Sequence, residues 1–395
     1  MFTVNGARRH LSSMILTVVL APAVSVAGNP GLVKERPSEG RCVPTDDGFM
    51  VPFEIRIPNS SVTFRMEPIP GGDFLMGSPD TETGRDADAE GPQRKVSVEP
   101  FWMAQCEVTW AEYKQYMQIY QSFKKFEELG LRKVTDENRI DAITAPTPLY
   151  EPTFTFEYGE DDQQPAVTIT QYSAKQYSKW LSAVTQLQLR LPTEAEWEYA
   201  CRAGSTTAYH FGDDPAALAE YAWFTGNNEV SGAKKVGGKK PNAWGLFDMH
   251  GNAAEWVLDS FGTYTPTDGV LMADRDWVRS ESPDHRVMRG GSWEFKADQC
   301  RSASRLVSDD STWKETDPNL PKSPWWYTDD PSRGVGFRLI RPLKTVSREA
   351  MEEFWKIDSE DTQYDVEDRL SEGRGVMGIV DKNLPAAIQA LEDGQ

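Results

Sequence analysis

The chain has 395 residues, with 61 acidic and 42 basic side chains, a formal net charge of -19 and 13 tryptophans. This length allows one large domain or two ordinary ones, and an apolar fraction of 39% is enough for a sizeable core. The acidic excess would repel phosphate backbones and anionic membranes, which argues against a nucleic-acid partner.

The N-terminus is typical of a secretory signal peptide. Arg8 and Arg9 precede the apolar run MILTVVLAPAV, and small residues follow at Ser25 and Ala27. Because this run is too short for a comfortable membrane span, we expect cleavage after Ala27, with an uncleaved anchor as the alternative. The mature protein is therefore predicted to be secreted or periplasmic, without a membrane span.

The next elements alternate between strand and helix patterns. Residues 28–60 indicate a linker with one strand, and TFRMEPIPGGDFLMGS (63–78) alternates around Pro-Gly-Gly as a β-hairpin does. KVSVEPFWMAQCEVT then predicts strands, and WAEYKQYMQIYQSF carries aromatic residues at helical spacing. The polar, proline-rich stretch that ends at Gln164 is expected to be an insertion loop.

Two amphipathic helices are predicted in the middle of the chain. The first lies in TITQYSAKQYSKWLSAVTQ (168–186), where Thr170 is a suitable N-cap. The second lies in RLPTEAEWEYACRAG (190–204), where Thr193 and Glu196 have the spacing of a capping box.

The rest of the chain predicts short strands and turns, followed by an acidic, partly helical appendage outside the core. The fold class is accordingly α+β: two helices with small antiparallel sheets and much ordered loop. Four cysteines (Cys42, Cys106, Cys201 and Cys300) form no CxxC pair, and their spacing argues against a zinc site. An oxidising compartment permits disulfides, but the sequence does not select a pairing.

Six segments together resemble the formylglycine-generating enzyme, or sulfatase-modifying factor, family. In chain order they are GGDFLMGS, FWMAQCEVTWAEYKQYM, RLPTEAEWEYACRAG, KKPNAWGLFDMHGNAAEW, RGGSW and GVGFRLIRPL. The resemblance implies that family's variant of the C-type lectin fold. It divides the chain into a signal peptide (1–27), an N-terminal segment (28–60), the family domain (61–343) and an acidic C-terminal extension (344–395).

The same resemblance shows what the chain lacks. The family's oxidases convert a sulfatase cysteine to formylglycine with copper, oxygen and a reductant, using two cysteines a few residues apart after RGGS. Thiolates are the soft ligands that select Cu(I), so this chemistry needs both. Here EFKADQCRSASR follows RGGSW and contains only Cys300, which aligns with a strand that leads to Ala303. We expect Cys300 to be a packing residue, with a disulfide or a copper-binding catalytic thiol as alternatives.

Calcium is the cofactor that the resemblance favours. Family members hold one ion with the segment that is WGLFDMHGNAAEW in this chain, and carboxylates and backbone carbonyls are suitable ligands. The alternative is that the acids only cap turns and pair with arginines. The candidate ligands are Asp248, Gly251, Ala253 and Glu255, with Asn227 and Asn228 in a weaker second ion loop.

A binding surface is predicted around PKSPWWYTDDP. Its adjacent Trp325 and Trp326 stand between prolines, and exposed aromatic side chains of this kind often mark recognition. Arg289 and Arg338 are candidates for an anionic pocket, although pairing with buried acids is the favoured alternative.

These features favour a secreted family member that lacks the oxidase pair. Such a protein would act as a binding or accessory module for a peptide or a partner protein, with a sulfatase as a candidate. The first alternative is a formylglycine-generating oxidase with rearranged ligands. The second, a lectin-like carbohydrate binder, depends on analogy with the fold and on the tryptophans expected to be exposed.

Overall fold

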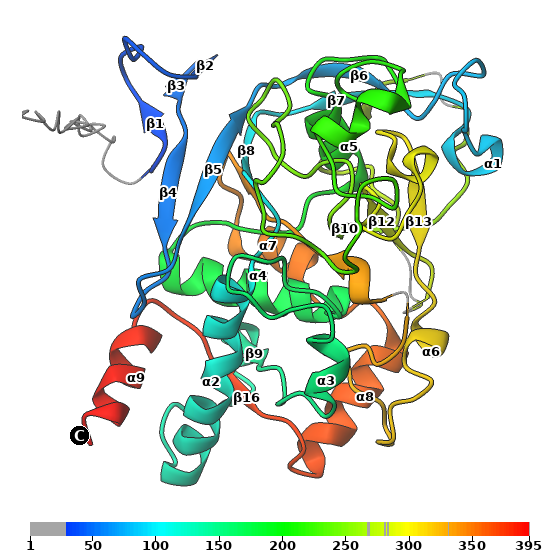
Figure 1. Cartoon of the computed structure of the whole chain (residues 1–395). Helices are drawn as coiled ribbons and strands as arrows, with labels where there is room; N and C mark the ends of the chain where they lie inside the picture. The colour runs from blue at the N-terminus through cyan, green and yellow to red at the C-terminus, as the bar shows by residue number, and fades with distance from the viewer. Residues whose placement is uncertain (1–28, 267–268, 280–281, 283, 331, 395) are drawn as a thin grey trace, which may run out of the picture.

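The computed structural model describes residues 29–266, 269–279, 282, 284–330 and 332–394, so the predicted signal peptide lies outside the described residues. Within them, five small sheets and several helices form an α+β fold (Figure 1), which confirms the predicted class. The helices are α1 Ala87–Glu90, α2 Trp110–Leu129, α3 Pro152–Thr155, α4 Gln171–Thr185, α5 Glu194–Arg202, α6 Asp310–Trp313, α7 Arg348–Trp355, α8 Glu360–Ser371 and α9 Leu384–Glu392, with 3-10 turns η1 Arg139–Asp141, η2 Pro215–Glu220, η3 Ala297–Cys300 and η4 Ser332–Gly334.

The strands are short, and two of the pairings are parallel. They are β1 Leu32–Val33, β2 Val43–Thr45, β3 Gly48–Met50, β4 Phe53–Arg56, β5 Thr63–Ile69, β6 Gly72–Met76, β7 Arg94–Val98, β8 Phe101–Ala104, β9 Ala142–Thr144, β10 Ala254–Ser260, β11 Leu271–Met272, β12 Arg286–Arg289, β13 Arg305–Val307, β14 Val335–Gly336, β15 Ile340–Pro342 and β16 Met377–Ile379. The sheet orders are β1-β3-β2, β15-β8-β5-β4, β11-β7-β6, β13-β12-β10-β14 and β16-β9. The β10–β14 and β11–β7 pairings are parallel, and the other pairings are antiparallel.

The hairpin predicted for residues 63–78 is wrong. β5 and β6 do not pair with each other; β5 pairs with β8 and β6 pairs with β7, in one continuous antiparallel register from Met66–Ala104 to Met76–Arg94. The two segments therefore form a single bent ribbon that changes sheet at its middle. A Cβ on Gly71 would lie 2.9 Å from Pro100, so glycine allows the two bends to cross closely.

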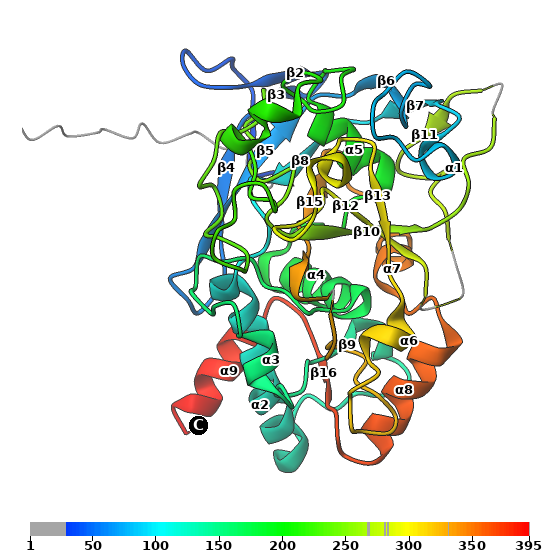
Figure 2. The same cartoon turned by 45° about the vertical axis from the view of Figure 1, so that its right-hand side comes forward.

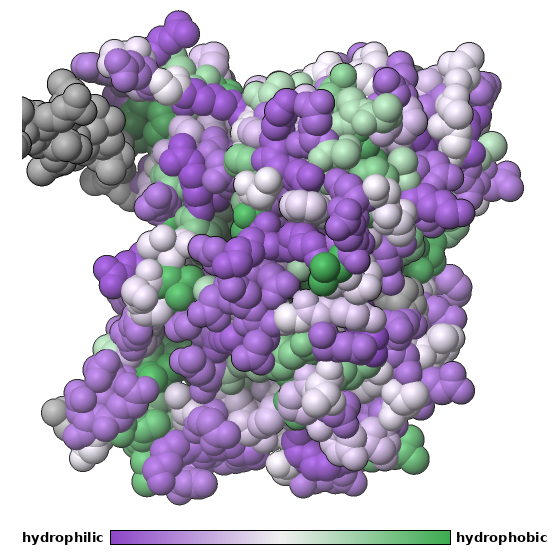
Figure 3. All heavy atoms as spheres, in the orientation of Figure 1, coloured by the Kyte–Doolittle hydropathy of each residue, from purple (hydrophilic) through white to green (hydrophobic). Residues whose placement is uncertain are grey.

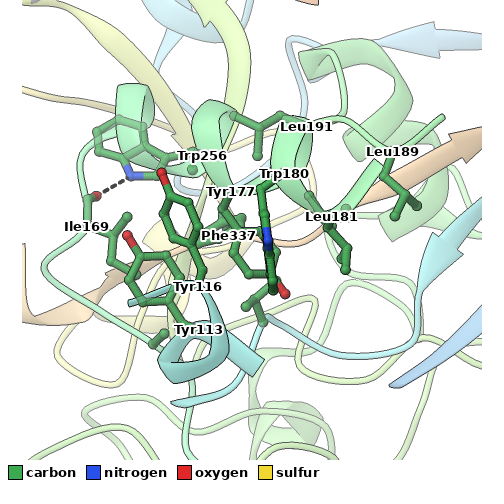
Figure 4. Packing of buried hydrophobic residues seen from close by; sticks show 14 of the residues in the cluster. Tyr113, Tyr116, Ile169, Tyr177, Trp180, Leu181, Leu189, Leu191, Trp256 and Phe337 are labelled. Carbon is green, nitrogen blue, oxygen red and sulfur yellow. Dashed lines mark hydrogen bonds between the residues drawn. The ribbon is translucent and has the colours of Figure 1, made fainter. Parts of the chain in front are cut away.

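The main core lies between α2 and α4 (Figure 4). Tyr113 and Tyr116 of α2 contact Tyr177 and Trp180 of α4, with ring centroids 5.6 Å apart in the Tyr113–Tyr177 and Tyr116–Trp180 pairs. The apolar face that the sequence predicts for this helix, formed by Tyr177, Trp180, Leu181 and Val184, is buried, and Thr170 caps the helix by accepting the N–H of Ser173. The Thr193–Glu196 capping box at the start of α5 is also present, which confirms both predicted helices.

Two segments that the sequence places outside the core belong to it. In the N-terminal segment, β4 pairs with β5, and Trp102 donates its indole N–H to the carbonyl of Val51 at 2.9 Å. In the C-terminal extension, α7 packs on α4 and β16 pairs with β9 of the predicted insertion loop. Figure 2 shows this orange and red segment running along α4 and the lower half of the molecule. The predictions of a linker and an appendage are therefore wrong.

The face of the molecule seen in Figure 3 is mainly polar. Figure 3 shows hydrophilic side chains over most of the face in view, with apolar side chains in small patches. No helix within the described residues is long and apolar enough to cross a membrane.

Candidate functional site

The RGGSW segment forms a tight turn after β12. Gly291 has φ 72°, and a Cβ at this position would lie 2.6 Å from Cys300 Sγ and 2.9 Å from the carbonyl oxygen of Gln299. The second glycine of the motif therefore makes room for Cys300, which closes the turn η3. The predicted strand position for Cys300 is wrong, because a 3-10 turn precedes the strand β13.

Cys300 fills space in a small apolar cluster. Its side chain is buried with Tyr209, Leu218 and Ala222, and burial raises the pKa of its thiol far above the ordinary range. A thiol that resists ionisation is a poor nucleophile and a poor metal ligand. All four cysteines are free, so the structure gives Cys300 the packing role and no disulfide.

A buried histidine lies next to Cys300. His250 Nδ1 is 2.8 Å from the carbonyl oxygen of Cys300, and its ring lies within 3.9 Å of Cys201 Sγ. Burial lowers the pKa of His250 well below its usual value and raises that of Cys201 to about 12. Both groups are therefore neutral at physiological pH and act as packing partners.

Two buried carboxylates are the most unusual feature of the site. Glu107 and Asp248 are each almost fully buried, and their carboxyl groups lie within hydrogen-bonding reach of each other. No donor among the described residues reaches Glu107 Oε2 or Asp248 Oδ1. Their other oxygens accept from Asn252 Nδ2 at 3.0 Å and from the N–H of Gly237 at 2.7 Å. Burial, with repulsion between the two charges, raises the pKa of Glu107 well above its usual value. Burial also raises that of Asp248 to about 6. Two such carboxylates need a shared proton or a cation.

Glu255, predicted as a calcium ligand, has a different role. Its carboxylate accepts two hydrogen bonds from Arg338, at 2.5 and 2.6 Å, and one from the indole N–H of Trp197 at 2.8 Å. Glu255 is therefore the counter-ion of buried Arg338, and Arg338 lines no anionic pocket. Gly251 and Ala253 lie between Asp248 and β10, where Gly251 has φ 128°.

Asn252 connects the carboxylate pair to RGGSW and was missed by the sequence analysis. Its side chain binds Glu107 and accepts the N–H of Lys234 at 2.7 Å. Its backbone carbonyl accepts the N–H of Trp293 at 3.0 Å. The available signal was an asparagine directly after glycine in MHGN, since asparagine tolerates its left-handed φ of 63°.

The predicted second ion loop is a set of turns. Asn227 Oδ1 accepts the N–H of Phe224 at 3.0 Å, and its Nδ2 donates to the carbonyl of Ala222 at 2.8 Å. Asn228 donates to the carbonyl of Gly232 at 3.4 Å. Across the described residues, no group of three or more His, Cys, Asp or Glu side chains is placed to hold a metal ion.

The predicted aromatic surface is wrong. Trp325 and Trp326 are 0% and 3% exposed, and their indole N–H groups donate to Thr144 Oγ1 at 3.0 Å and to the carbonyl of Thr147 at 2.8 Å. Both acceptors come from the predicted insertion loop, which folds over the tryptophans. Arg289 is likewise buried and is paired with Glu198, so it forms no binding surface.

The surface beside RGGSW carries two adjoining hollows. One, of about 760 Å³, lies against η3, with Lys296 and Asp298 in its wall. The other, of about 610 Å³, has the side chains of Phe74, Tyr199 and Trp244 in its wall. Pro79 and Thr206 line both hollows, which therefore lie next to each other; we call the one against η3 the groove beside η3.

Comparisons with known proteins agree with the motifs. Residues 59–316 match the family described as "Sulfatase-modifying factor enzyme 1-like domain". Formylglycine-generating enzyme of Bos taurus is 26% identical over 264 residues, which cover 60% of this chain and 67% of that protein. Inactive C-alpha-formylglycine-generating enzyme 2 of Mus musculus is 30% identical over 257 residues, or 58% of this chain and 74% of that protein. The solved structure of PvdO from Pseudomonas aeruginosa has a TM-score of 0.51 and 27% identity, and the match covers 73% of this chain and all of that one.

Proposed function

The chain belongs to the sulfatase-modifying factor family, and from this we propose that it is a secreted or periplasmic binding or accessory module without the family's oxidase reaction. Its similarity extends both to formylglycine-generating enzymes and to an inactive member, so family membership alone does not decide the activity. The observation that supports the proposal is the single, buried cysteine in the segment after RGGSW.

Copper does not fit this segment. Cu(I) selected by soft ligands would need two accessible thiolates, whereas Cys300 is buried, its thiol pKa is raised, and its Sγ packs over Gly291. By the resemblance, the positions where the pair would stand hold Glu294, Phe295, Lys296 and Asp298 or are deleted, since this segment is shorter than in the oxidases. We therefore derive no oxidation step for this chain.

The groove beside η3 is the proposed place for a partner. It runs past the segment that carries the cysteines in the oxidases, so a segment of a partner protein lying there would contact Lys296 and Asp298. A peptide or protein is the favoured ligand class, and a sulfatase is the first partner to test. A lectin-like role loses its support, because Trp325 and Trp326 are buried.

Calcium is the proposed structural cofactor. The unpartnered oxygens of Glu107 and Asp248 are hard ligands that suit a cation, and the carbonyls of Gly251 and Ala253 belong to the same loop. A bound Ca²⁺ would neutralise the carboxylate pair and fix the loop that joins it to RGGSW through Asn252. The ligand set would then contain Glu107 in place of Glu255.

The test is mass spectrometry of a CxPxR-containing peptide incubated with the mature protein, Cu(I), oxygen and a thiol reductant. An active formylglycine-generating enzyme is the control. We expect no loss of mass at the peptide cysteine. In a separate measurement, fluorescence anisotropy with a labelled sulfatase, we expect the wild type to bind and a Lys296→Glu/Asp298→Lys variant to lose this binding. Conversion of the peptide by this protein, abolished in Cys300→Ser, would overturn the proposal. Unchanged binding by the double variant would exclude the groove beside η3 as the binding site.

A further inference from the structure

One half of the bent ribbon has an uncovered edge. β4 pairs along β5, whereas β6 is the last strand of the sheet β11-β7-β6 and, in the part of the chain that the structure describes, has no strand on its other side. Figure 1 places β6 at the upper margin of the molecule. An uncovered edge presents backbone donors and acceptors to any extended chain that comes alongside.

The register identifies the residues that face outward. Ala273, the residue after β11, donates its N–H to the carbonyl of Ser97 in β7 at 3.0 Å. The backbone N–H and C=O groups of Ser97 therefore face β11 and point away from β6. Alternation along an antiparallel pair then turns the N–H and C=O groups of Asp73 and Leu75 outward. Among the described residues, these groups have no backbone partner on the outer side.

An apolar hollow lies directly beside this edge. The rings of Phe74, Tyr199 and Trp244 form a row, with centroids 5.3 Å apart for Phe74–Tyr199 and 4.9 Å for Tyr199–Trp244. Leu75 is 55% exposed, and the loop that contains Thr206 forms part of the wall of the hollow. A strand paired with β6 would therefore place alternate side chains against the aromatic row.

We propose that β6 binds an extended segment of a partner protein by strand addition, with an apolar side chain in the aromatic hollow and basic residues flanking it. This inference rests on the proposed binding role and names the class of partner. The net charge of -19 on the whole chain attracts a basic segment at long range and opposes association with a second copy, which carries the same net charge. The charges at the hollow itself are paired, Asp73 with Lys95 at 3.1 Å and Arg202 with Glu198 at 2.8 Å, so the basic residues of the segment would flank the hollow and not enter it.

The experiment uses the full mature protein and a peptide array. Its nonapeptides alternate threonine with valine, leucine, phenylalanine, tyrosine or tryptophan between terminal lysines. The test variant is Leu75→Pro, which removes an outward N–H that β7 does not use, and its matched control is Leu75→Thr, which keeps that N–H. Unfolding temperatures and circular dichroism check that both variants remain folded.

We expect array members to bind the wild type and Leu75→Thr, and to bind Leu75→Pro about tenfold more weakly or worse. Replacement of the flanking lysines by glutamate should weaken binding further. Equal binding by the two Leu75 variants, or no binding of any member, would overturn strand addition. A sulfatase that binds the wild type and Leu75→Pro equally would leave the accessory role in place without this edge. Dimerisation that Leu75→Pro abolishes would instead make a second copy the occupant.

Discussion

At the scale of single residues, Gly291 and Cys300 depend on each other. Gly291→Ala would introduce a Cβ 2.6 Å from Cys300 Sγ at a position with φ 72°. We expect a loss of about 2 to 4 kcal/mol in the free energy of unfolding, measured with urea. Adding Cys300→Ala should recover part of this loss, because it removes the sulfur but not the backbone strain. Independent, additive effects of the two substitutions would contradict the packing role of Cys300.

Cys300→Ser tests the packing role of Cys300 without changing Gly291. Replacing a buried thiol by a hydroxyl without a partner should lower the free energy of unfolding by about 1 to 3 kcal/mol. Binding of a partner in the groove should be unaffected at a temperature where the variant is folded. Equal stability of Cys300→Ser and wild type would mean that the thiol is not packed as the structure shows.

The pair formed by Glu107 and Asp248 predicts how one substitution changes both the unfolding temperature and its dependence on calcium. In Glu107→Gln the oxygen of the new side-chain amide can still accept from Asn252, and the amide NH₂ group can donate to Asp248 Oδ1. The variant therefore leaves neither carboxyl position without a hydrogen-bond partner, and it needs no cation. We expect the variant to unfold at a higher temperature than the wild type in chelator and to gain nothing from added Ca²⁺. The wild type should gain stability with Ca²⁺ concentration by mass action. A calcium gain in Glu107→Gln equal to that of the wild type would exclude Glu107 as a ligand.

At the scale of elements, the start of α2 contains a titratable cap. Glu112 accepts from the backbone N–H and the hydroxyl of Thr109, and burial raises its pKa to about 7. Between about pH 4.5 and pH 7 the folded protein holds a proton that the unfolded chain releases, so this group makes stability fall as pH rises. Above pH 7 its contribution is constant.

Glu112→Gln should therefore gain stability relative to the wild type as pH rises from 5 to 8, by an amount on the order of 1 to 3 kcal/mol. Denaturant unfolding at several pH values measures this difference. Glu128→Gln is the control, because Glu128 lies on the same helix with a side chain that is 66% exposed, and it should show little pH dependence. A flat difference between Glu112→Gln and wild type would show that Glu112 is ionised throughout.

Local signals explain which elements were predictable. The caps at Thr170 and Thr193 act within one turn, so the sequence alone identifies the starts of α4 and α5. Alternation in residues 63–78 correctly indicates strands, but it carries no information about which strand is the partner, and the Pro-Gly-Gly signal suggested a hairpin where the ribbon only bends. The candidate site residues show the same difference between local signals and long-range contacts. The motif located Asp248, whereas its partner Glu107 lies 141 positions earlier and is brought near only by the fold.

At the scale of the whole molecule, the C-terminal extension completes the core. Nearly all of α4 is buried, including Lys175 and Lys179, and their ammonium groups contact Asp358 and Glu352 of the extension at 2.7 Å. The acidic character of residues 344–395 suggested a separate appendage, because composition does not show that some of these acids neutralise buried lysines. Composition also does not show that Trp325 and Trp326 are buried, because the segment that covers them is far away in the sequence.

Removing residues 344–395 should consequently leave a protein that aggregates or fails to fold, because it would strip the carboxylates from two buried lysines and uncover the apolar core against which Val366, Val376 and Val380 pack. Asp358→Asn isolates the electrostatic part: Asp358 also pairs with Arg286 at 2.8 Å, so its loss leaves two buried cations short of a counter-ion. We expect this variant to lose about 3 to 5 kcal/mol in denaturant unfolding. Glu353→Gln, which breaks only an exposed pair with Lys356, should lose less than about 1 kcal/mol. A truncated chain with the wild-type unfolding temperature would make the extension an appendage after all, and the binding surfaces would then have to be sought on the face of α4 that it covers.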